Sequence, residues 1–593
     1  MISLFDQLPD LTLLEIFSYL SCADALWSFF KLNSRLTTLL TEQGFYRHVN
    51  LSSTGKKQFE TIFSTLRLNE IQSLVIDRCT SPLQLKRWPH LTHLTALRLQ
   101  GVRNFREVFK LAKKHSQTLT HLTVESSRYF CTNGITKSMA YPSWNMCEFL
   151  ERTLCCLPNL QSLDLGMETS FVLYKWPFKA IEAPLTYLKI SLARTHFLID
   201  IFSTKPLSYT LKQLHIKIRD LCGDFGFSLR NKGLLHRMES LHTFTFIKSF
   251  KCYSNEEWEF VNVLTNSDIM PVLRRINFSV FIDANDLVQM THSNLFVDDR
   301  HIDVHYVFMI SDDRQHSELD EYVPRGSLSH PRQIASVTFI SECWPVDSMM
   351  HNRDEIYLNK PRNRQHIFYT LPWAFNEFFP LCVPDGYINE LEVFTSTSPV
   401  NRVGSSHVRK FSISNNFPSL ATSFPHIMSS NKVVELHLSQ CDRELSVNLP
   451  IFDHLIITDS LDLLNKCCFS RNIRSIQITL NQEYIHLARN DWNDLPILST
   501  LPFLNSLRIL LYDMNVPPND ISRHIIVETI SNMSDFCFCF RRKNYGNRRN
   551  FESAHTMQAI FITQLRNDIL ALPLNEKPRI VVEKGGYGLI AWF

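Results

Sequence analysis

The sequence predicts an α/β repeat protein in which a short helical module precedes a long array of strands. Three observations support this fold class. The opening residues carry apolar side chains at helical spacing, a short apolar unit then recurs along the chain, and helical patterns separate several of these units. Because one such unit cannot bury its own apolar face, the pattern favours units that stack on their neighbours.

Three short helices are expected within residues 8–40. The first is marked by apolar residues at i, i+3, i+4 and i+7, namely Leu13, Ile16, Phe17 and Leu20. Ser21 followed by Asp24 predicts the start of the second helix, because a serine oxygen can accept from a backbone N–H three residues on. Asn33 or Ser34 can cap the third helix in the same way.

The three helices carry more apolar side chains than their buried stripes need. The surplus residues are Leu8, Leu11, Leu14, Trp27 and Leu32. Such a surplus must be covered, either by the rest of the chain or by another protein. Two alternatives follow: the helices are a cap on the next domain, or they are a docking module.

The order of residues in this stretch resembles the F-box, the short helical module of SCF-type ubiquitin ligases. The resemblance covers about residues 4–50 and rests on Leu8-Pro9, Leu14–Leu20, Asp24 with Leu26, and Leu32–Leu36. In that family the module docks on the Skp adaptor subunit, which joins it to a cullin. The resemblance implies docking through Leu8, Pro9, Ile16, Phe17, Leu20 and Leu26. Many F-boxes carry a tryptophan in the third helix, and this sequence has none there.

Composition bounds the remaining possibilities. The chain has 593 residues, of which 44% are apolar and 20% charged, as expected of a folded, soluble protein. A net charge of +3 gives no electrostatic preference for nucleic acid or a membrane surface. The first residues lack the pattern of a secretory signal, and no apolar run is long enough to span a membrane. Fifteen scattered cysteines indicate reduced thiols, so we expect a cytoplasmic or nuclear protein.

After Asn50 a unit of the form apolar-x-x-apolar-x-apolar recurs fifteen times. Its third apolar positions are Ile76, Leu99, Val124, Leu165, Ile190, Ile216, Phe246, Phe278, Phe339, Val393, Ile413, Leu438, Ile457, Ile478 and Ile509. Many successive units lie 19 to 26 residues apart. Both the unit and its period resemble a degenerate leucine-rich repeat, which implies an irregular solenoid, or horseshoe. Helical patterns such as 103–115, 144–157 and 256–264 would supply the returning segments.

In a strand, alternate residues face opposite sides, so the apolar positions would point into the stack. The residues between them would then line a concave sheet and face a target protein. Candidate target-binding residues at these outward positions are Val75, Arg98, Asp164, Lys189, His215 and His437. For each of them, a merely solvated side chain is the alternative.

Five regions follow from these patterns. They are the F-box-like module at 1–50, the first part of the array at 51–310, an irregular insertion or loop region at 311–384, the second part of the array at 385–520, and a C-terminal cap at 521–593. Two apolar runs around Lys584–Gly588 predict a hairpin that closes this cap. The pattern leaves open whether the array forms one horseshoe or two arcs.

The chemistry-bearing motifs are weak. His301 and His305 have a spacing that suits zinc on a helix, but no third ligand is apparent. The basic stretch Arg541–Arg549 is more simply a solvated loop than a nucleic-acid site in a near-neutral chain. No phosphate-binding loop, nucleophile elbow or zinc-protease motif occurs. We therefore expect no catalytic residue, no metal and no cofactor.

The F-box-like module followed by repeats implies a substrate-recognition adaptor of an SCF-type ubiquitin ligase. Its expected partners are the Skp adaptor, a cullin through that adaptor, and an unknown protein substrate, with no nucleic acid and no membrane. The alternative is a non-catalytic leucine-rich-repeat scaffold that binds proteins without ligase association.

Overall fold

The protein is mixed α/β, with a large and mostly parallel sheet. The computed structural model describes residues 7–30, 32–42, 44, 46–52, 54, 56–77, 85, 87–102, 105–126, 140–167, 172–176, 181–218, 235–248, 257–297, 300–312, 314, 316–341, 363–372, 374–375, 377–378, 388–395, 410–414, 433–439, 452–459, 464, 473–481, 491–512, 520–531, 533–541, 551–574, 578–582 and 588–593.

Among the described residues, the larger sheet has 14 strands in the order β1-β2-β3-β4-β5-β7-β8-β9-β10-β11-β15-β14-β17, with β6 beside β7. Pairing is parallel from β1 to β11 and antiparallel beyond. The strands are β1 (His48–Asn50), β2 (Ser73–Asp77), β3 (Ala96–Val102), β4 (His121–Ser126), β5 (Ser162–Asp164), β6 (Val172–Leu173), β7 (Tyr187–Leu192), β8 (Gln213–Ile218), β9 (Thr243–Lys248), β10 (Arg275–Ile282), β11 (Asp303–Ser311), β14 (Gln333–Ser341), β15 (Asn363–Leu371) and β17 (Ile388–Thr395).

A second sheet has nine strands in the part of the chain that the structure describes, in the order β16-β18-β19-β20-β21-β22-β23-β25-β24. It is parallel up to β23, and the last two strands form an antiparallel hairpin. Its strands are β16 (Glu377–Phe378), β18 (Lys410–Ser414), β19 (Val433–Ser439), β20 (Phe452–Thr458), β21 (Ser475–Asn481), β22 (Ser506–Tyr512), β23 (Asp535–Arg541), β24 (Arg579–Val582) and β25 (Gly588–Trp592). A separate two-stranded hairpin joins β12 (Gly326–Ser327) and β13 (His330–Pro331).

Helices lie between many of the strands. They are α1 (Asp10–Ser18), α2 (Cys22–Phe29), α3 (Ser34–Glu42), α4 (Lys56–Thr65), η2 (Leu68–Glu70), α5 (Phe105–Lys114), α6 (Ala140–Cys156), α7 (His196–Phe202), α8 (Lys205–Thr210), α9 (Glu257–Leu264), α10 (Ala284–Met290), α11 (Asn294–Val297), α12 (His316–Asp320), η8 (Asp491–Thr500), α17 (Asp520–Ile530) and α18 (Phe551–Leu570). Among the described helices, none combines the length and apolar character that a membrane crossing requires.

Each apolar unit of the sequence coincides with a strand, and the parallel units align in register. Leu74, Leu97 and Leu122 are partners across β2, β3 and β4. Leu163 and Leu188 continue the row through β5 and β7. All five are at most 2% exposed and lie in one core cluster with the apolar faces of α5 and α6. The apolar positions of the unit therefore face the helices, because alternate residues of a strand point to one side.

The middle of the chain contains more regular structure than its polar composition predicts. The units that begin at Ile334 and Ile388 form β14 and β17, but these strands are antiparallel to their neighbours. The stretch Ser311–Gln333, expected to be an exposed loop, contains α12 and the hairpin β12–β13. Its apolar residues Leu319 and Val323 join the main core, which a count of charged residues does not reveal.

The N-terminal helices begin where the capping residues predict. Ser21 accepts a hydrogen bond from the Asp24 N–H at 3.1 Å at the start of α2. Asn33 accepts from the Leu36 N–H at 2.8 Å at the start of α3. Each cap satisfies a backbone donor that a helix terminus otherwise leaves unpaired.

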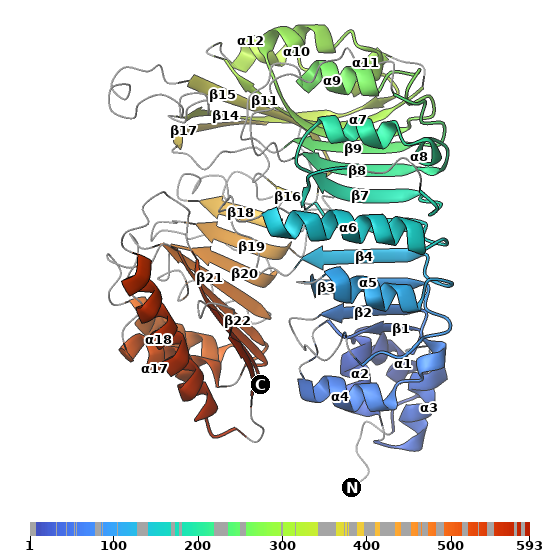
Figure 1. Ribbon diagram of the computed structural model, residues 1–593. Helices are drawn as coiled ribbons and strands as arrows, with labels where there is room; N and C mark the ends of the chain where they lie inside the picture. Colours follow the sequence, from blue (N-terminus) through green and yellow to red (C-terminus); the bar gives the residue numbers. More distant parts are fainter. Residues whose placement is uncertain are drawn as a thin grey trace.

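The two sheets share one hydrophobic cluster. Ile247, Phe281 and Val307 of the larger sheet are buried together with Leu438 and Leu455 of the second. Figure 1 shows the larger sheet along one side of the molecule and the second sheet along the other, with β11, β15, β14 and β17 between them at one end. The second sheet therefore packs on the part of the larger sheet formed by β9 to β11.

The C-terminal region contains the hairpin that its pattern indicates, preceded by a long helix. Phe561 and Leu565 of this helix, α18, pack in the core of the second sheet. The hairpin β24–β25 pairs Val582 with Leu589. The glycine-rich turn of this hairpin and most of the basic stretch 541–549 lie outside the described residues.

Candidate functional site

The outward positions of the repeat unit form one row across the larger sheet. Val75 is paired in register with Arg98, and Arg98 with Thr123. Thr123 is paired with Asp164, Asp164 with Lys189, and Lys189 with His215. Five of the six predicted target-binding residues therefore lie on a single line across β2, β3, β5, β7 and β8. The line faces away from the helices, because its residues alternate with the buried leucines.

The exposure of this row differs along the sheet. Strand β2 alternates between half-buried and buried residues, as a sheet with one uncovered face does. In β7 and β8 the alternation holds only for the first four residues. In β9 and β10 every residue after the first is buried. We call the outward side of β2 to β8 the open face, and its border lies at β9.

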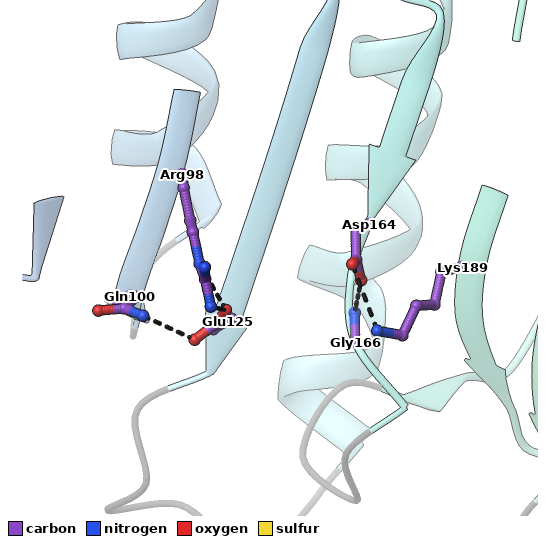
Figure 2. Close-up of polar contacts among 6 residues, drawn as sticks. All are labelled: Arg98, Gln100, Glu125, Asp164, Gly166 and Lys189. Carbon is purple, nitrogen blue, oxygen red and sulfur yellow. Dashed lines mark hydrogen bonds and ion pairs between the residues drawn. The ribbon is translucent and has the colours of Figure 1, made fainter. Parts of the chain in front are cut away.

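At one end of the open face Arg98 is neutralised by its neighbour. Its guanidinium donates to Glu125 of β4 from Nε at 2.8 Å and from Nη2. Gln100 donates to the other oxygen of the same carboxylate at 3.0 Å. Figure 2 shows the three side chains converging from two adjacent strands. Arg98 remains 45% exposed, so this ion pair contributes more to the chemistry of the surface than to stability.

A second ion pair lies further along the row. Lys189 donates from Nζ to Asp164 Oδ2 at 3.3 Å, and the Gly166 N–H donates to Asp164 Oδ1 at 2.8 Å. Figure 2 shows Asp164 between these two partners. Gly166 adopts a positive φ of 74°, a conformation that glycine reaches without strain. The side chains of Lys189 and Asp164 are only 20% and 22% exposed, so this pair is screened less than the first.

His215 lies at the border of the open face, at the end of a chain of hydrogen bonds. Arg275 donates from Nε to Asn277 Oδ1 at 3.3 Å, and Asn277 donates to Thr245 Oγ1 at 3.1 Å. The Thr245 hydroxyl lies 2.9 Å from His215 Nδ1. Burial, together with the nearby positive charge of Lys189, lowers the pKa of His215 from 6.5 to about 4. The imidazole is therefore neutral at physiological pH.

His437 is the predicted residue that the fold does not bring to this row. It lies on β19 of the second sheet, where its Nε2 is 3.0 Å from Thr458 Oγ1 on β20. It belongs to the equivalent slot of its own repeat unit. An equivalent position in the repeat unit therefore does not place it on the same sheet as the other five.

Several polar residues of this surface were missed from the sequence. Thr123, Thr245 and Asn277 occupy the same slot of the repeat unit as the predicted residues, so the unit itself is the signal that identifies them. Glu125 and Gln100 lie beyond the unit. Only the alignment of β3 with β4 brings these two together.

The N-terminal helices present a different kind of surface. Leu11 and Tyr19 are 80% and 81% exposed, Leu32 is 65% exposed and Trp27 is 41% exposed. Of the residues implied in docking, Pro9 is exposed, and Leu8, Ile16 and Leu20 are half-buried. We call these eight residues the apolar surface of the helical module.

Phe17 and Leu26, the other two residues implied in docking, are buried within this chain. Phe17 lies in the core of the three helices, with its ring centroid 5.1 Å from that of Phe29. Leu26 is 3% exposed and packs in the same cluster as Tyr46 and Phe59 of the region that follows. Both side chains hold the module together or hold it on the sheet, so the helices act partly as a cap.

Arg35 of α3 fixes the start of α1. Its Nε donates to Asp10 Oδ1 at 2.7 Å, and its Nη2 donates to the carbonyl oxygen of Leu8 at 2.6 Å. A charge-assisted pair of this kind orients the segment Leu8-Pro9 relative to the third helix. The two ends of the apolar surface are thereby held in one arrangement.

His301 and His305 do not lie on a helix. His305 is buried in β11, with its Nε2 3.3 Å from Asp303 Oδ1, and His301 precedes the strand with a positive φ of 54°. Arg332 also pairs with Asp303, and these partners hold the pKa of that carboxyl well below its usual range, although burial opposes the shift. Within the described ranges, no three metal-ligating side chains come together.

Comparison with known proteins adds no family to this description. No family model matches the chain, and no curated protein matches it.

Proposed function

We propose that this protein is a substrate-recognition adaptor of an SCF-type ubiquitin ligase. Its helical module would dock on a Skp adaptor and through it on a cullin, while the repeat array holds a target protein. The chain would supply proximity and orientation, and the transfer chemistry would belong to other subunits. In finer detail, the proposal takes the three helices as an F-box and the parallel strands as a leucine-rich-repeat solenoid.

The observation that carries the proposal is the apolar surface of the helical module. Leu11, Tyr19 and Leu32 are largely exposed, although Leu26 on the other side of the module is buried against the array. Exposed large apolar residues clustered on one small module mark an interaction site more often than chance. The sequence resemblance supplies the kind of partner.

The array supports the second half of the proposal. Equivalent leucines of successive units are paired in register, and the helices between them pack on one side of the strands. On the other side of β2, β3 and β5, half-buried or exposed residues alternate with the buried ones. A row of side chains held in register across a sheet is a surface on which a target can be bound in one orientation.

The buried positions of Phe17 and Leu26 refine the docking residues. A partner would contact Leu8, Pro9, Ile16 and Leu20, as the resemblance implies, together with the exposed Leu11, Tyr19, Trp27 and Leu32. Phe17 and Leu26 would act indirectly by keeping the helices in place.

The test is a pulldown of the full chain with purified Skp adaptor. We expect the wild type to bind and the double variant Pro9→Ala/Ile16→Lys to lose binding, because the lysine charge would be buried without a partner in the complex. The matched control is Phe503→Lys, which places the same charge at an exposed apolar residue in the turn before β22. Binding by the double variant equal to that of the wild type and of the control would contradict the docking surface.

The second candidate function is a protein-binding scaffold without ligase association. It is favoured by the packing of Leu26, Cys22 and Ala23 in the core of the array, which is what a cap requires. Failure of the wild type to bind the Skp adaptor, with the fold intact, would favour this alternative.

A further inference from the structure

The donor and acceptor atoms at the border of the open face are not balanced. Here the carboxylate oxygens of Asp164 are both engaged, by Lys189 and by the Gly166 N–H. The Asn277 oxygen is engaged by Arg275. Around these oxygens lie the N–H or O–H groups of Tyr187, Lys189, His215 and Arg275, so the border itself, rather than the whole surface, offers mainly donors.

The hydrogen-bond chain fixes which nitrogen of His215 carries the proton. Thr245 is 6% exposed, and its hydroxyl already accepts from Asn277. Among the described residues, the acceptor within reach of the Thr245 hydrogen is His215 Nδ1. A buried hydroxyl hydrogen without an acceptor is costly, so the hydroxyl donates to Nδ1. The neutral ring must then carry its proton on Nε2.

The Nε2–H group of His215 has no acceptor in the part of the chain that the structure describes, and the ring remains half-buried at the border of the open face. Three further donors surround it. Lys189 is its partner in register, and the Tyr187 ring centroid lies 5.1 Å from that of the imidazole. Burial raises the pKa of Tyr187 above its usual value, so its hydroxyl stays protonated. Arg275 is close enough to lower the pKa of His215.

These four residues, Tyr187, Lys189, His215 and Arg275, form the donor cluster. We propose that the donor cluster is the recognition site for a carboxylate side chain in an acidic segment of the target protein. The inference rests on the proposed function, because it takes the open face to be the target surface. A carboxylate offers about four lone-pair positions and a negative charge, which complement the two neutral donors, the Arg275 guanidinium and the Lys189 ammonium, although Asp164 already pairs with that ammonium.

Within the cluster, Lys189 and Arg275 supply charge, and His215 supplies direction. Because Nδ1 is held by Thr245, the imidazole cannot turn over to present an acceptor without breaking the hydrogen-bond chain. Gln213, the register partner of Tyr187, adds an amide that has both N–H donors and an acceptor oxygen. The buried strands β9 and β10 keep the chain rigid behind the surface.

The test measures fluorescence anisotropy of labelled peptides on the full chain. One peptide repeats glutamate, serine and glycine, and its partner carries glutamine in place of glutamate. We expect the glutamate peptide to bind more tightly, and His215→Phe and Lys189→Met each to weaken it by about tenfold. His215→Gln keeps a neutral N–H donor and should recover part of that loss.

Two controls make the result specific. His524→Phe removes an exposed histidine of α17, outside the open face, and it should leave peptide binding unchanged. Thr245→Val removes the hydrogen that fixes the tautomer while keeping the shape of the side chain, and it should weaken binding. Thermal unfolding of each variant separates loss of binding from loss of fold, and Lys189→Met, at a partly exposed position, serves if a His215 variant is unfolded.

The pH dependence gives an independent readout. Since His215 is a neutral donor, the affinity should stay constant from about pH 7.5 to about pH 5.5, whereas an ordinary histidine would gain charge there. Equal binding of the two peptides, or unchanged binding by His215→Phe and Lys189→Met, would overturn the inference. If that happens while the Skp adaptor still binds, the adaptor role stands and only the chemistry of the target is wrong.

Discussion

At the scale of single residues, two histidines with similarly lowered pKa values have different roles because their surroundings differ. His215 and His115 both have a pKa lowered from 6.5 to about 4, chiefly by burial. His115 is 1% exposed, accepts from the Leu91 N–H at 3.4 Å and stacks on His90 with 5.4 Å between ring centroids. His215 faces the open surface instead. The first is therefore a structural residue, and the second is available to a partner.

A pH dependence of stability follows for His115. Its pKa in the folded state lies below its value in the unfolded chain, so the unfolded state takes up the proton first as the pH falls. We expect the free energy of unfolding to decrease between about pH 6.5 and about pH 4, by up to about 3 kcal/mol for this residue. Chemical denaturation at a series of pH values measures the slope.

The test variant replaces His115 by phenylalanine, and the control makes the same change at His93. His115→Phe should flatten the slope, while His93→Phe, at an exposed position on the loop before β3, should leave it as in the wild type. The same slope in the wild type and in His115→Phe would show that this histidine is not the source.

At the scale of the elements, the capping residues could be predicted from the sequence, and strand direction could not. Ser21 and Asn33 accept the backbone hydrogen bonds that their positions predict. The unit at Ile334 resembles the others, yet β14 is antiparallel to both of its neighbours. A cap depends on contacts three residues apart, whereas strand direction depends on the path of the chain between strands.

The cap of α3 gives a local prediction. Asn33→Ala removes the acceptor of the Leu36 N–H and should destabilise the helix by about 1 kcal/mol. Amide hydrogen exchange within α3 should then become about fivefold faster. Ser34→Ala changes the next, exposed residue and should have no such effect. If both variants exchange equally fast, Asn33 does not cap this helix.

At the scale of the whole molecule, the second sheet decides which part of the larger sheet can meet a partner. Val307 of β11 is fully buried in the cluster shared by the two sheets. Val75 of β2 is half-buried on the open face. The two valines lie on the same side of one sheet and differ only in what covers them.

The same substitution at these two valines tests where the open face ends. Val307→Asp buries a carboxylate without a designed partner and should destabilise the protein by several kcal/mol. In Val75→Asp the new carboxylate lies beside Arg98 in register, so the stability should change by less than about 1 kcal/mol. The midpoints of thermal unfolding measure both. Similar losses for the two variants would mean that the open face is covered as well.

Local patterns in this chain are sufficient to predict its three N-terminal helices, the caps of the second and third, the strands of the repeat unit and five of the residues on its outward row. These features depend on neighbours a few residues apart, so the order of the side chains carries them. The tertiary structure decided that His437 lies apart from the other candidates, that Phe17 and Leu26 are buried, and that the open face ends at β9. These outcomes depend on which distant segments pack together, and a repeating apolar pattern is the same whether its outer face is covered or not.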